Sequence, residues 1–329
     1  MSKLPEQDLI DRIFTVSEKK FENITLEVFQ FQYRNNPLYQ SFCKSLYCNA
    51  NSIKHIKQIP FLTIEFFKTH QLKTTSFQPE LTFESSGTTG VNTAQHFIKH
   101  ASIYQQSYLK TFSAFYGDPS SFCMLALLPS YLERKNSSLV YMMNDLINKS
   151  GNASSGFFLH DTEKLHQLIL QNEAKKQPVI LLGVTYALID FAIKYPMTLK
   201  YTQVIETGGM KGRKEELTCD EVQSILKKQF NTHQIHSEYG MTELLSQAYS
   251  SSKGIFKTPP WMKIIMRAED DPFDLTVTTG AINIIDLANI YSCAFIATSD
   301  AGKLYPDETF EITGRLDNSD IRGCALMSI

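Results

Sequence analysis

The sequence lacks a long hydrophobic run, a signal peptide and an excess of charge of one sign. Its most apolar stretches, 122–128 and 179–182, have the length of a buried strand and are too short to cross a bilayer. The first residues are polar and acidic, unlike an export signal. The 32 basic residues nearly balance the 34 acidic ones, for a net charge of −2. We therefore expect a cytoplasmic protein with no membrane span that does not bind nucleic acid.

Cysteine is present, but not in a metal-binding pattern. The six cysteines occupy positions 43, 48, 123, 219, 293 and 324, and none has zinc-ligand spacing with another cysteine or a histidine. In a reducing cytoplasm we expect free thiols, each of them either packed in the core or chemically active. Internal repeats and low-complexity tracts are also lacking.

The composition that remains is typical of a globular enzyme. Hydrophobic residues make up 43% and charged residues 20% of the 329 residues. Short apolar runs alternate with helical patterns through the middle of the chain. Strands are expected at 122–128, 156–159, 179–184, 203–206 and 234–238, and helices at 138–148, 162–173, 186–194 and 214–230. This alternation predicts an α/β fold with mainly parallel strands and helices on both faces.

The flanking regions differ from this pattern. Helical spacing at 8–20 and 26–46 predicts an aromatic-rich cap over a sheet, followed by a strand at 81–84 and a helix at 101–115. Beyond residue 255 the pattern is of strands with little helix, at 261–267, 281–286, 292–298 and 309–313. We therefore predict an α/β core with a helical cap over 1–254 and a small antiparallel or barrel-like section over 255–329.

Ligands of open parallel sheets bind beyond the carboxyl ends of strands, so strand-ending loops are the first places to search. One is Ser85-Ser86-Gly87-Thr88-Thr89-Gly90. Its hydroxyl and N–H groups can donate to phosphate oxygens, and its glycines allow close approach of the backbone. It is not a Walker A loop, because no Gly-Lys-Ser/Thr ends it. Alone, it would be read as an ordinary polar turn.

Two further loops follow expected strands. In Glu238-Tyr239-Gly240-Met241-Thr242-Glu243, the tyrosine can stack on a purine, the threonine can hold a phosphate oxygen and the carboxylate can bind Mg²⁺. The glycines of Thr207-Gly208-Gly209-Met210-Lys211-Gly212 allow a ring or a ribose to lie against the backbone. Each has a simpler alternative, as a helix start and as a strand-to-helix turn.

Two weaker candidates lie nearer the end of the chain. Asp300, in Thr298-Ser299-Asp300-Ala301-Gly302, can accept both hydroxyl groups of a ribose from what we expect to be a turn. Arg315 supplies a cation within the charged segment 314–324.

In this order, the five segments resemble the motifs of the adenylate-forming superfamily, which includes acyl-CoA synthetases, adenylation domains and luciferases. The resemblance spans about residues 81–324. It implies ATP and Mg²⁺ as cofactors, with the nucleotide held by residues from all five segments. The implied contacts are Ser85 to Gly90 on the triphosphate, Gly208, Gly209 and Tyr239 on the adenine within a motif that includes Glu238 and Gly240, Thr242 on the α-phosphate, Glu243 on the metal, and Asp300 and Arg315 on the ribose.

The chain departs from the superfamily pattern in two places. Many members continue the first loop with Pro-Lys-Gly, where this chain has Asn92-Thr93-Ala94, so we expect Lys99, His96 or His100 to replace the lysine. Most members also begin a C-terminal domain soon after the equivalent of Arg315, and we expect that domain to be essentially absent.

One branch of the superfamily matches these departures. The loop followed by His96, and the tail ending in Cys324, are similar to the LuxE-type acyl-protein synthetases of bacterial fatty-acid reductase systems. In that branch a fatty acid is adenylated and passed to a cysteine near the C-terminus, then to a partner protein. This implies a ligase in which Cys324 accepts the acyl group. Arg315 and Arg322 would lower the pKa of its thiol, although an idle, packed thiol is an equal alternative.

Two other functions stay open at this point. An acid–CoA ligase of the phenylacetate type would use free CoA as the acceptor. A noncatalytic subunit that binds acyl groups or nucleotide would explain the missing lysine. The acid, the final acceptor and the oligomeric state are left open by the sequence.

Overall fold

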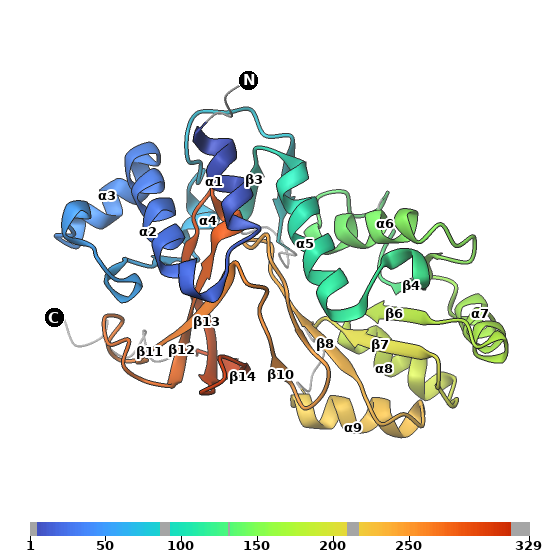
Figure 1. The fold of residues 1–329 in the computed structure, drawn as a ribbon. Coiled ribbons are helices and arrows are strands. Elements are labelled where there is room, and N and C mark those ends of the chain that lie inside the picture. Colours follow the sequence, from blue (N-terminus) through green and yellow to red (C-terminus); the bar gives the residue numbers. More distant parts are fainter. Residues whose placement is uncertain (1–4, 86–92, 131, 209–216, 317–329) are drawn as a thin grey trace, which may run out of the picture.

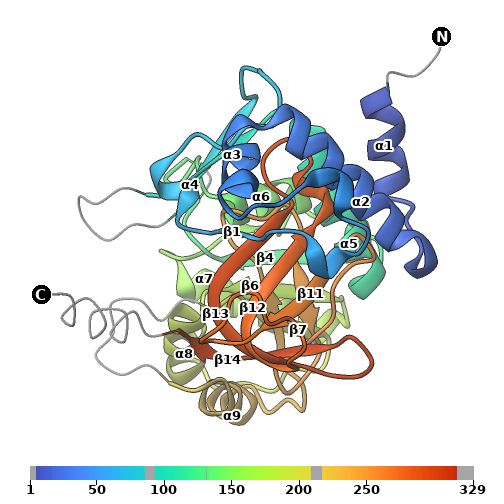
Figure 2. The same ribbon diagram turned by 90° about the vertical axis from the view of Figure 1, so that its left-hand side faces the viewer.

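The computed structural model describes residues 5–85, 93–130, 132–208 and 217–316. Two sheets dominate it (Figure 1): a mainly parallel one flanked by α5 to α9, and an antiparallel one covered by α1 to α3. Figure 2 shows the second sheet from its own side, with β12 and β13 running beneath α2 and α3.

The first sheet confirms the predicted α/β fold. Its strands β4 to β8 run parallel to one another, and β9 pairs antiparallel with β8 at one edge. Every residue of β4 and β6 is buried, as expected for strands covered on both faces. The strand order is β5 (Gly156–Phe157), β4 (Cys123–Leu127), β6 (Val179–Gly183), β7 (Thr202–Glu206), β8 (His236–Tyr239) and β9 (Ala248–Ser250).

Helices cover this sheet on both faces, as predicted. Alternate residues of β4 enter different apolar clusters: Met124 packs with α5 and α6, whereas Leu125 packs with α7, α8 and α9. A capping box between Thr218 and Glu221 starts α9 at Cys219, later than the expected 214. The helices are α5 (Ala101–Tyr116), α6 (Ser138–Ser150), α7 (Thr162–Lys175), α8 (Thr185–Lys194) and α9 (Cys219–Gln229), with the short η3 (Pro119–Ser121) before β4.

The antiparallel sheet confirms the expected β-rich section. Its strand order is β10 (Ile255–Phe256), β14 (Phe310–Arg315), β13 (Phe295–Leu304), β12 (Thr279–Asp286) and β11 (Met262–Arg267), with η4 (Leu287–Asn289) after β12. The short β1 (Leu62–Thr63) adds to β13 in parallel. The expectation that Asp300 lies in a turn is wrong, because β13 continues to Leu304 and pairs with β14 along that stretch.

The N-terminal helices lie over the antiparallel sheet. Gln32 donates to the carbonyls of Asn289 and Ile290, and the ring of Phe29 packs on Phe295. The expected helices at 8–20 and 26–46 are divided differently, because Asn36 caps a new helix that begins at Pro37. The elements are α1 (Pro5–Ile13), α2 (Glu18–Asn35), α3 (Pro37–Ser45), η1 (Ala50–Ser52), η2 (Ile56–Gln58) and α4 (Phe66–Thr69). The domain boundary at residue 254 stays a prediction.

The strand predicted at 81–84 exists, but it does not belong to the parallel sheet. It is β2 (Leu81–Glu84), and it pairs antiparallel with β3 (Gln95–Ile98) in a separate two-stranded sheet. Glu84 is tied to the segment after β4, because its N–H donates to the carbonyl of Asn136 and its carboxylate accepts from the Asn136 amide. The first loop therefore starts from a hairpin placed beside the parallel sheet.

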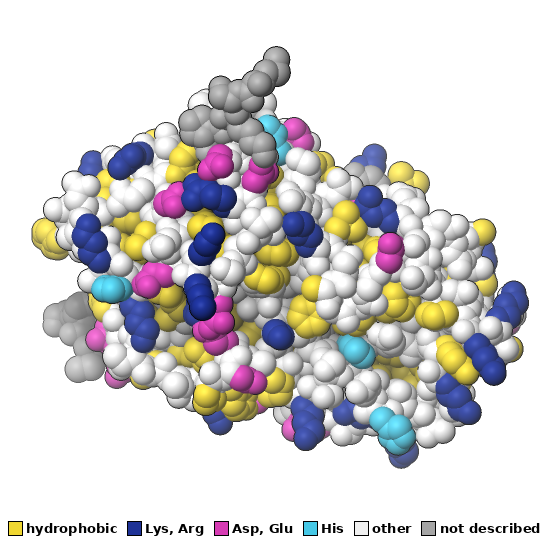
Figure 3. Space-filling view, viewed as in Figure 1, with side chains coloured by type: hydrophobic (Ala, Val, Ile, Leu, Met, Phe, Trp, Pro, Cys, Tyr) yellow, Lys and Arg dark blue, Asp and Glu magenta, His cyan; other side chains and the backbone are white. Residues whose placement is uncertain are grey.

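On the face shown in Figure 3, acidic and basic side chains are interspersed where α1 and α2 lie. Arg12 is an example, since its guanidinium bonds both Asp8 and Glu27. Within the described residues, no helix combines the length and the hydrophobicity that crossing a membrane requires.

Candidate active site

Three of the sequence-predicted residues meet where the two sheets touch. The Tyr239 hydroxyl, at the end of β8, donates to Asp300 Oδ2 at 2.8 Å. Arg315 Nε donates to Asp300 Oδ1 at 3.3 Å from the paired position on β14. Segments separated by more than sixty residues of sequence are thus joined in one cluster. Each carboxylate oxygen of Asp300 keeps a second lone pair for a further donor.

The position of Asp300 depends on close packing around it. The register of β13 and β14 shifts between Ala301 and Gly302. A side chain at Gly302 would bring its Cβ within 2.3 Å of the Glu311 carbonyl oxygen, so only glycine fits. Arg267 bonds the Thr298 carbonyl at 2.7 Å and braces the start of this stretch. The Asp-x-Gly pattern therefore reflects a strand bulge and not a turn.

The Tyr239 side chain is buried and is packed between two phenylalanine rings in addition to its bond with Asp300. Its ring packs edge-on against Phe310, with centroids 5.7 Å apart, and lies 6.0 Å from the ring of Phe256. Burial, followed by the nearby Asp300 carboxylate, raises the pKa of its hydroxyl well above the usual value. The hydroxyl is therefore a hydrogen-bond donor at neutral pH. The predicted stacking of Tyr239 on adenine stays a prediction.

Glu238 turns back over the glycine that follows Tyr239. A Cβ atom at Gly240 would lie 2.4 Å from Glu238 Oε1, so the side chain of Glu238 occupies the space that glycine leaves. Burial, and to a smaller extent the charge of Glu206, raises the pKa of Glu238 to about 8. The glutamate is thus largely a neutral carboxylic acid at pH 7.

The predicted loop 207–212 is anchored by a residue that sequence reasoning missed. Glu206, the last residue of β7, accepts from the Gly208 N–H at 2.9 Å and from the Thr185 hydroxyl at 2.7 Å. Gly208 has a φ of +71°, a conformation that glycine adopts easily. Gly209, Ser86 to Gly90 and Cys324 lie outside the described residues. Of the first loop, Ser85 is described, and its hydroxyl oxygen accepts from the Ala94 N–H at 3.0 Å.

Thr242 and Glu243 begin a segment whose backbone is held by buried side chains. His96 on β3 bonds the carbonyl of Thr242 at 2.8 Å, and the Asn289 amide donates to the carbonyl of Glu243 at 2.8 Å. Glu243 is itself 6% exposed. Its carboxylate is an oxygen ligand of the kind that Mg²⁺ prefers, usually one or two per site together with substrate phosphates and water. Among the described residues, no three His, Cys, Asp or Glu side chains are grouped so that they could hold a metal ion by themselves.

The substitutes proposed for the missing lysine are engaged elsewhere. His96 is buried with both ring nitrogens bonded. The Lys99 ammonium lies 4.0 Å from the ring centroid of Tyr291 and 3.5 Å from a Glu6 carboxylate oxygen, and His100 pairs with Glu80. In this structure none of the three is placed as a free phosphate ligand.

The buried polar residues Glu206, Asp286 and Asn289 were missed by sequence reasoning. Asp286 does carry a signal in the sequence, because it follows the mainly apolar stretch 281–285, in which Asn283 is the one polar residue. In the structure Asp286 is 0% exposed. A charged residue there needs hydrogen-bond partners. His236 lies two residues before Glu238 on the same strand, and its ring is hydrogen-bonded to the Tyr116 hydroxyl. Burial, and after it the charge of Glu238, raises the pKa of this tyrosine.

Comparison with known families decides between the functions left open. The family described as acyl-protein synthetase, LuxE, matches residues 10–328. The chain belongs to this family. It is accordingly a ligase that activates acyl groups and transfers them to protein, and the acid–CoA ligase and the noncatalytic subunit are not favoured.

Individual relatives agree with this assignment. The chain is similar to the long-chain-fatty-acid–luciferin-component ligase of Aliivibrio fischeri, with 25% identity over 333 residues that cover 93% of this chain and 86% of that protein. Among solved structures it resembles 2-hydroxyisobutyryl-CoA ligase, with a TM-score of 0.63 and 10% identity, covering 96% of this chain and 80% of that chain. It also resembles ATP-bound MatB of Rhodopseudomonas palustris, with a TM-score of 0.54 and 16% identity.

The match with MatB covers 74% of this chain but spans only half of that longer ligase. At such low identities, the structural likeness shows the fold alone. That fold is the adenylate-forming one.

Proposed function

We propose that the protein activates a long-chain fatty acid with ATP as an acyl-adenylate and passes the acyl group to a thiol. The observation that carries the proposal is the meeting of Tyr239, Asp300 and Arg315 at the junction of the two sheets. The relative from Aliivibrio fischeri, named as a long-chain-fatty-acid ligase, supports the choice of acid. The resemblance to a structure solved with ATP supports the nucleotide.

The chemistry requires two anions to react, so charge compensation is the main task of the site. A carboxylate oxygen of the fatty acid attacks the α-phosphorus of ATP, and the bond from that phosphorus to pyrophosphate breaks. Mg²⁺, when bound through Glu243, would offset phosphate charge. The Thr242 hydroxyl and the N–H and hydroxyl groups of Ser85 to Gly90 would donate to phosphate oxygens, and Asp300 with Arg315 would hold the ribose.

Transfer completes the proposed reaction. A thiolate attacks the acyl carbon of the mixed anhydride, the new thioester forms and AMP leaves. We assign the thiol to Cys324, from which the acyl group would pass to a partner protein. Cys324 lies outside the described residues, so this assignment rests on the family and on the sequence.

Exchange of labelled pyrophosphate into ATP tests the first step. We expect exchange that depends on Mg²⁺ and on a saturated acid, and that rises with chain length across a series from four to about eighteen carbons. Absence of exchange with every acid at high enzyme concentration would refute acyl-adenylate formation.

Labelled acid and ATP, supplied without CoA, test the second step. We expect a label on the protein that neutral hydroxylamine removes, as it removes thioesters, and that is lost in Cys324→Ala. Cys219→Ala is the matched control, because Cys219 is an exposed thiol in the described part of the chain. Label that persists in Cys324→Ala would reject Cys324 as the acceptor and leave adenylation intact.

A further inference from the structure

The backbone from Thr242 to Ser246 is held by buried side chains that come from distant parts of the sequence. His96 and Asn289 bond its first two carbonyl groups. Asp286 accepts from the N–H groups of Leu245 and Ser246, at 2.9 Å and 3.0 Å. A loop held at four backbone groups within five residues has little freedom to shift without breaking buried bonds.

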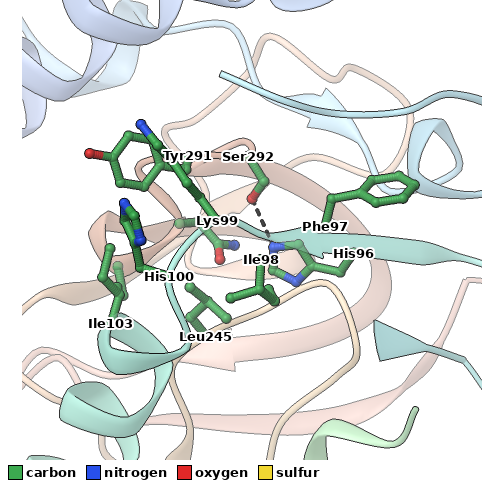
Figure 4. Close-up of a pocket in the computed structure, with 11 residues that line it drawn as sticks. His96, Phe97, Ile98, Lys99, His100, Ile103, Leu245, Tyr291 and Ser292 are labelled. Atoms are coloured by element: carbon green, nitrogen blue, oxygen red, sulfur yellow. Dashed lines mark hydrogen bonds between the residues drawn. The ribbon is translucent and has the colours of Figure 1, made fainter. Parts of the chain in front are cut away.

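His96 is the member of this group that lies on β3, the strand that follows the first loop. Its Nδ1 faces a carbonyl oxygen, which can only accept, so Nδ1 carries the proton and donates to Thr242. Its Nε2 then accepts from the Ser292 hydroxyl at 2.9 Å (Figure 4). The ring is 1% exposed and packs edge-on against Phe67. Burial lowers the pKa of His96 to about 4, which keeps this single neutral form at pH 7.

Asp286 and Asn289 belong to the segment that leads out of β12. Besides the two N–H groups, Asp286 accepts from the Ser246 hydroxyl at 2.6 Å. That hydroxyl also accepts from the Trp261 indole N–H at 2.9 Å. The Asn289 amide N–H donates to the Glu243 carbonyl, while its buried Oδ1 has no hydrogen-bond partner among the residues that the structure describes.

Side chains from the N-terminal region also form hydrogen bonds with the segment that leads out of β12. Thr74 donates to the Ser292 carbonyl at 2.7 Å, and Asn36 donates to the same carbonyl at 3.1 Å. Gln32 is bonded to Asn289, Ile290 and Ala294. Contacts therefore run from the helical cap through 286–292 to Thr242 and Glu243.

We propose that His96, Asn289 and Asp286 are positioning residues for adenylation, which hold Thr242 and Glu243 at the place where the α-phosphate and the metal bind. The proposal rests on the proposed function for its catalytic consequence. His96 acts through its Nδ1–H bond to the Thr242 carbonyl, and the Ser292 hydroxyl, which donates to Nε2, holds the ring in this orientation.

Two substitutions at His96 separate the roles of its nitrogens. His96→Asn keeps an amide N–H near the position of Nδ1 and so can still donate to Thr242. His96→Gln places its amide near the position of Nε2 and loses that donor. We expect His96→Gln to lower kcat for acid-dependent pyrophosphate exchange on the order of tenfold with little change in KM for ATP. We expect His96→Asn to stay within about threefold of wild type.

Further variants complete the comparison. Asn289→Asp keeps the size of the side chain but loses the donor to Glu243, and we expect it to lower kcat as His96→Gln does. His55→Gln is the matched control, since its side chain is 71% exposed, and it should leave kcat unchanged. Equal losses in His96→Asn and His96→Gln, or no loss in either His96→Gln or Asn289→Asp, would overturn the proposal.

Amide hydrogen exchange decides the same question without activity. In His96→Gln, a peptide covering 241–247 should exchange faster than in wild type, and in His96→Asn it should exchange at nearly the wild-type rate. Equal exchange in the two variants rejects His96 as the holder of this segment. If wild type gives no pyrophosphate exchange, the proposed function fails, and the peptide measurement still decides whether His96 holds the loop.

Discussion

Replacing Glu238 by glutamine should stabilise the protein increasingly as the pH rises. The carboxyl group lies on β8 in a residue that is 8% exposed. Burial raises its pKa to about 8. Burial, and after it the charge of Glu238, raises the pKa of three nearby tyrosines, Tyr104, Tyr116 and Tyr249. Glutamine has the same shape and cannot ionise.

The sign and size of the effect follow from the two pKa values. Between the ordinary value of 4.5 and the folded value of about 8, the folded protein keeps a proton that the unfolded chain has released. Stability therefore falls as the pH rises through this interval and levels off above it. A full pH unit corresponds to at most about 1.4 kcal/mol, so ionisation of Glu238 costs about 2 kcal/mol between pH 6.5 and pH 8.5. Glu238→Gln does not lose this stability, because glutamine has no carboxyl group to ionise.

Urea unfolding at the two pH values measures the effect. Trp261 is the only tryptophan of the chain and is 4% exposed, so its fluorescence reports unfolding. His96 and His236 have lowered pKa values and titrate below this interval in both proteins, so they cancel from the difference. Glu163→Gln, at an exposed position of α7, is the control. A difference between Glu238→Gln and wild type that stays constant from pH 6.5 to 8.5 would refute the buried, neutral carboxyl.

Two other substitutions test the surroundings of Asp300, one the packing of its strand and the other the proposed nucleotide contact of its partner Arg315. Gly302→Ala should lower the free energy of unfolding by about 1–3 kcal/mol, because its Cβ would lie 2.3 Å from a backbone oxygen. Gly156→Ala, whose Cβ would meet side-chain atoms at 3.5 Å, should cost less in the same urea titration. Arg315→Ala should raise the KM for ATP in pyrophosphate exchange roughly tenfold with a smaller effect on kcat, because it would remove a proposed ribose contact. An unchanged KM would remove Arg315 from the nucleotide site.

The parallel sheet was predictable because its signals are local. Runs such as Val179–Gly183 are apolar at every position, and they are bounded by helical patterns whose spacing a short window detects. The five motifs can also be read in order directly from the sequence, so the resemblance to the family could be stated before any contact was known. Helix ends were less accurate, since caps such as Thr218 with Glu221 depend on a few side-chain bonds.

What the sequence did not reveal depends on partners far along the chain. His96 meets Thr242 across 146 residues, and no local pattern distinguishes that bond from a phosphate contact. Asp300 was assigned to a turn from its local Asp-x-Gly pattern. Only its pairing with Arg315 on β14 shows that β13 continues through it. The strand at 81–84 was recognised, but the sheet that it joins was not, because its partner β3 lies on the far side of the loop.

The antiparallel sheet takes part in forming the candidate site, and is more than an addition to the α/β core. Tyr239 comes from the parallel sheet, yet the groups that fix it are Asp300 on β13 and Phe310 on β14. The loop that carries Thr242 is held in turn by Asp286, at the end of β12. Both the proposed ribose contacts and the proposed phosphate contacts are thus set by how the two sheets dock. A substitution that loosens this docking should therefore disturb both sets of contacts together, even if it touches no ligand.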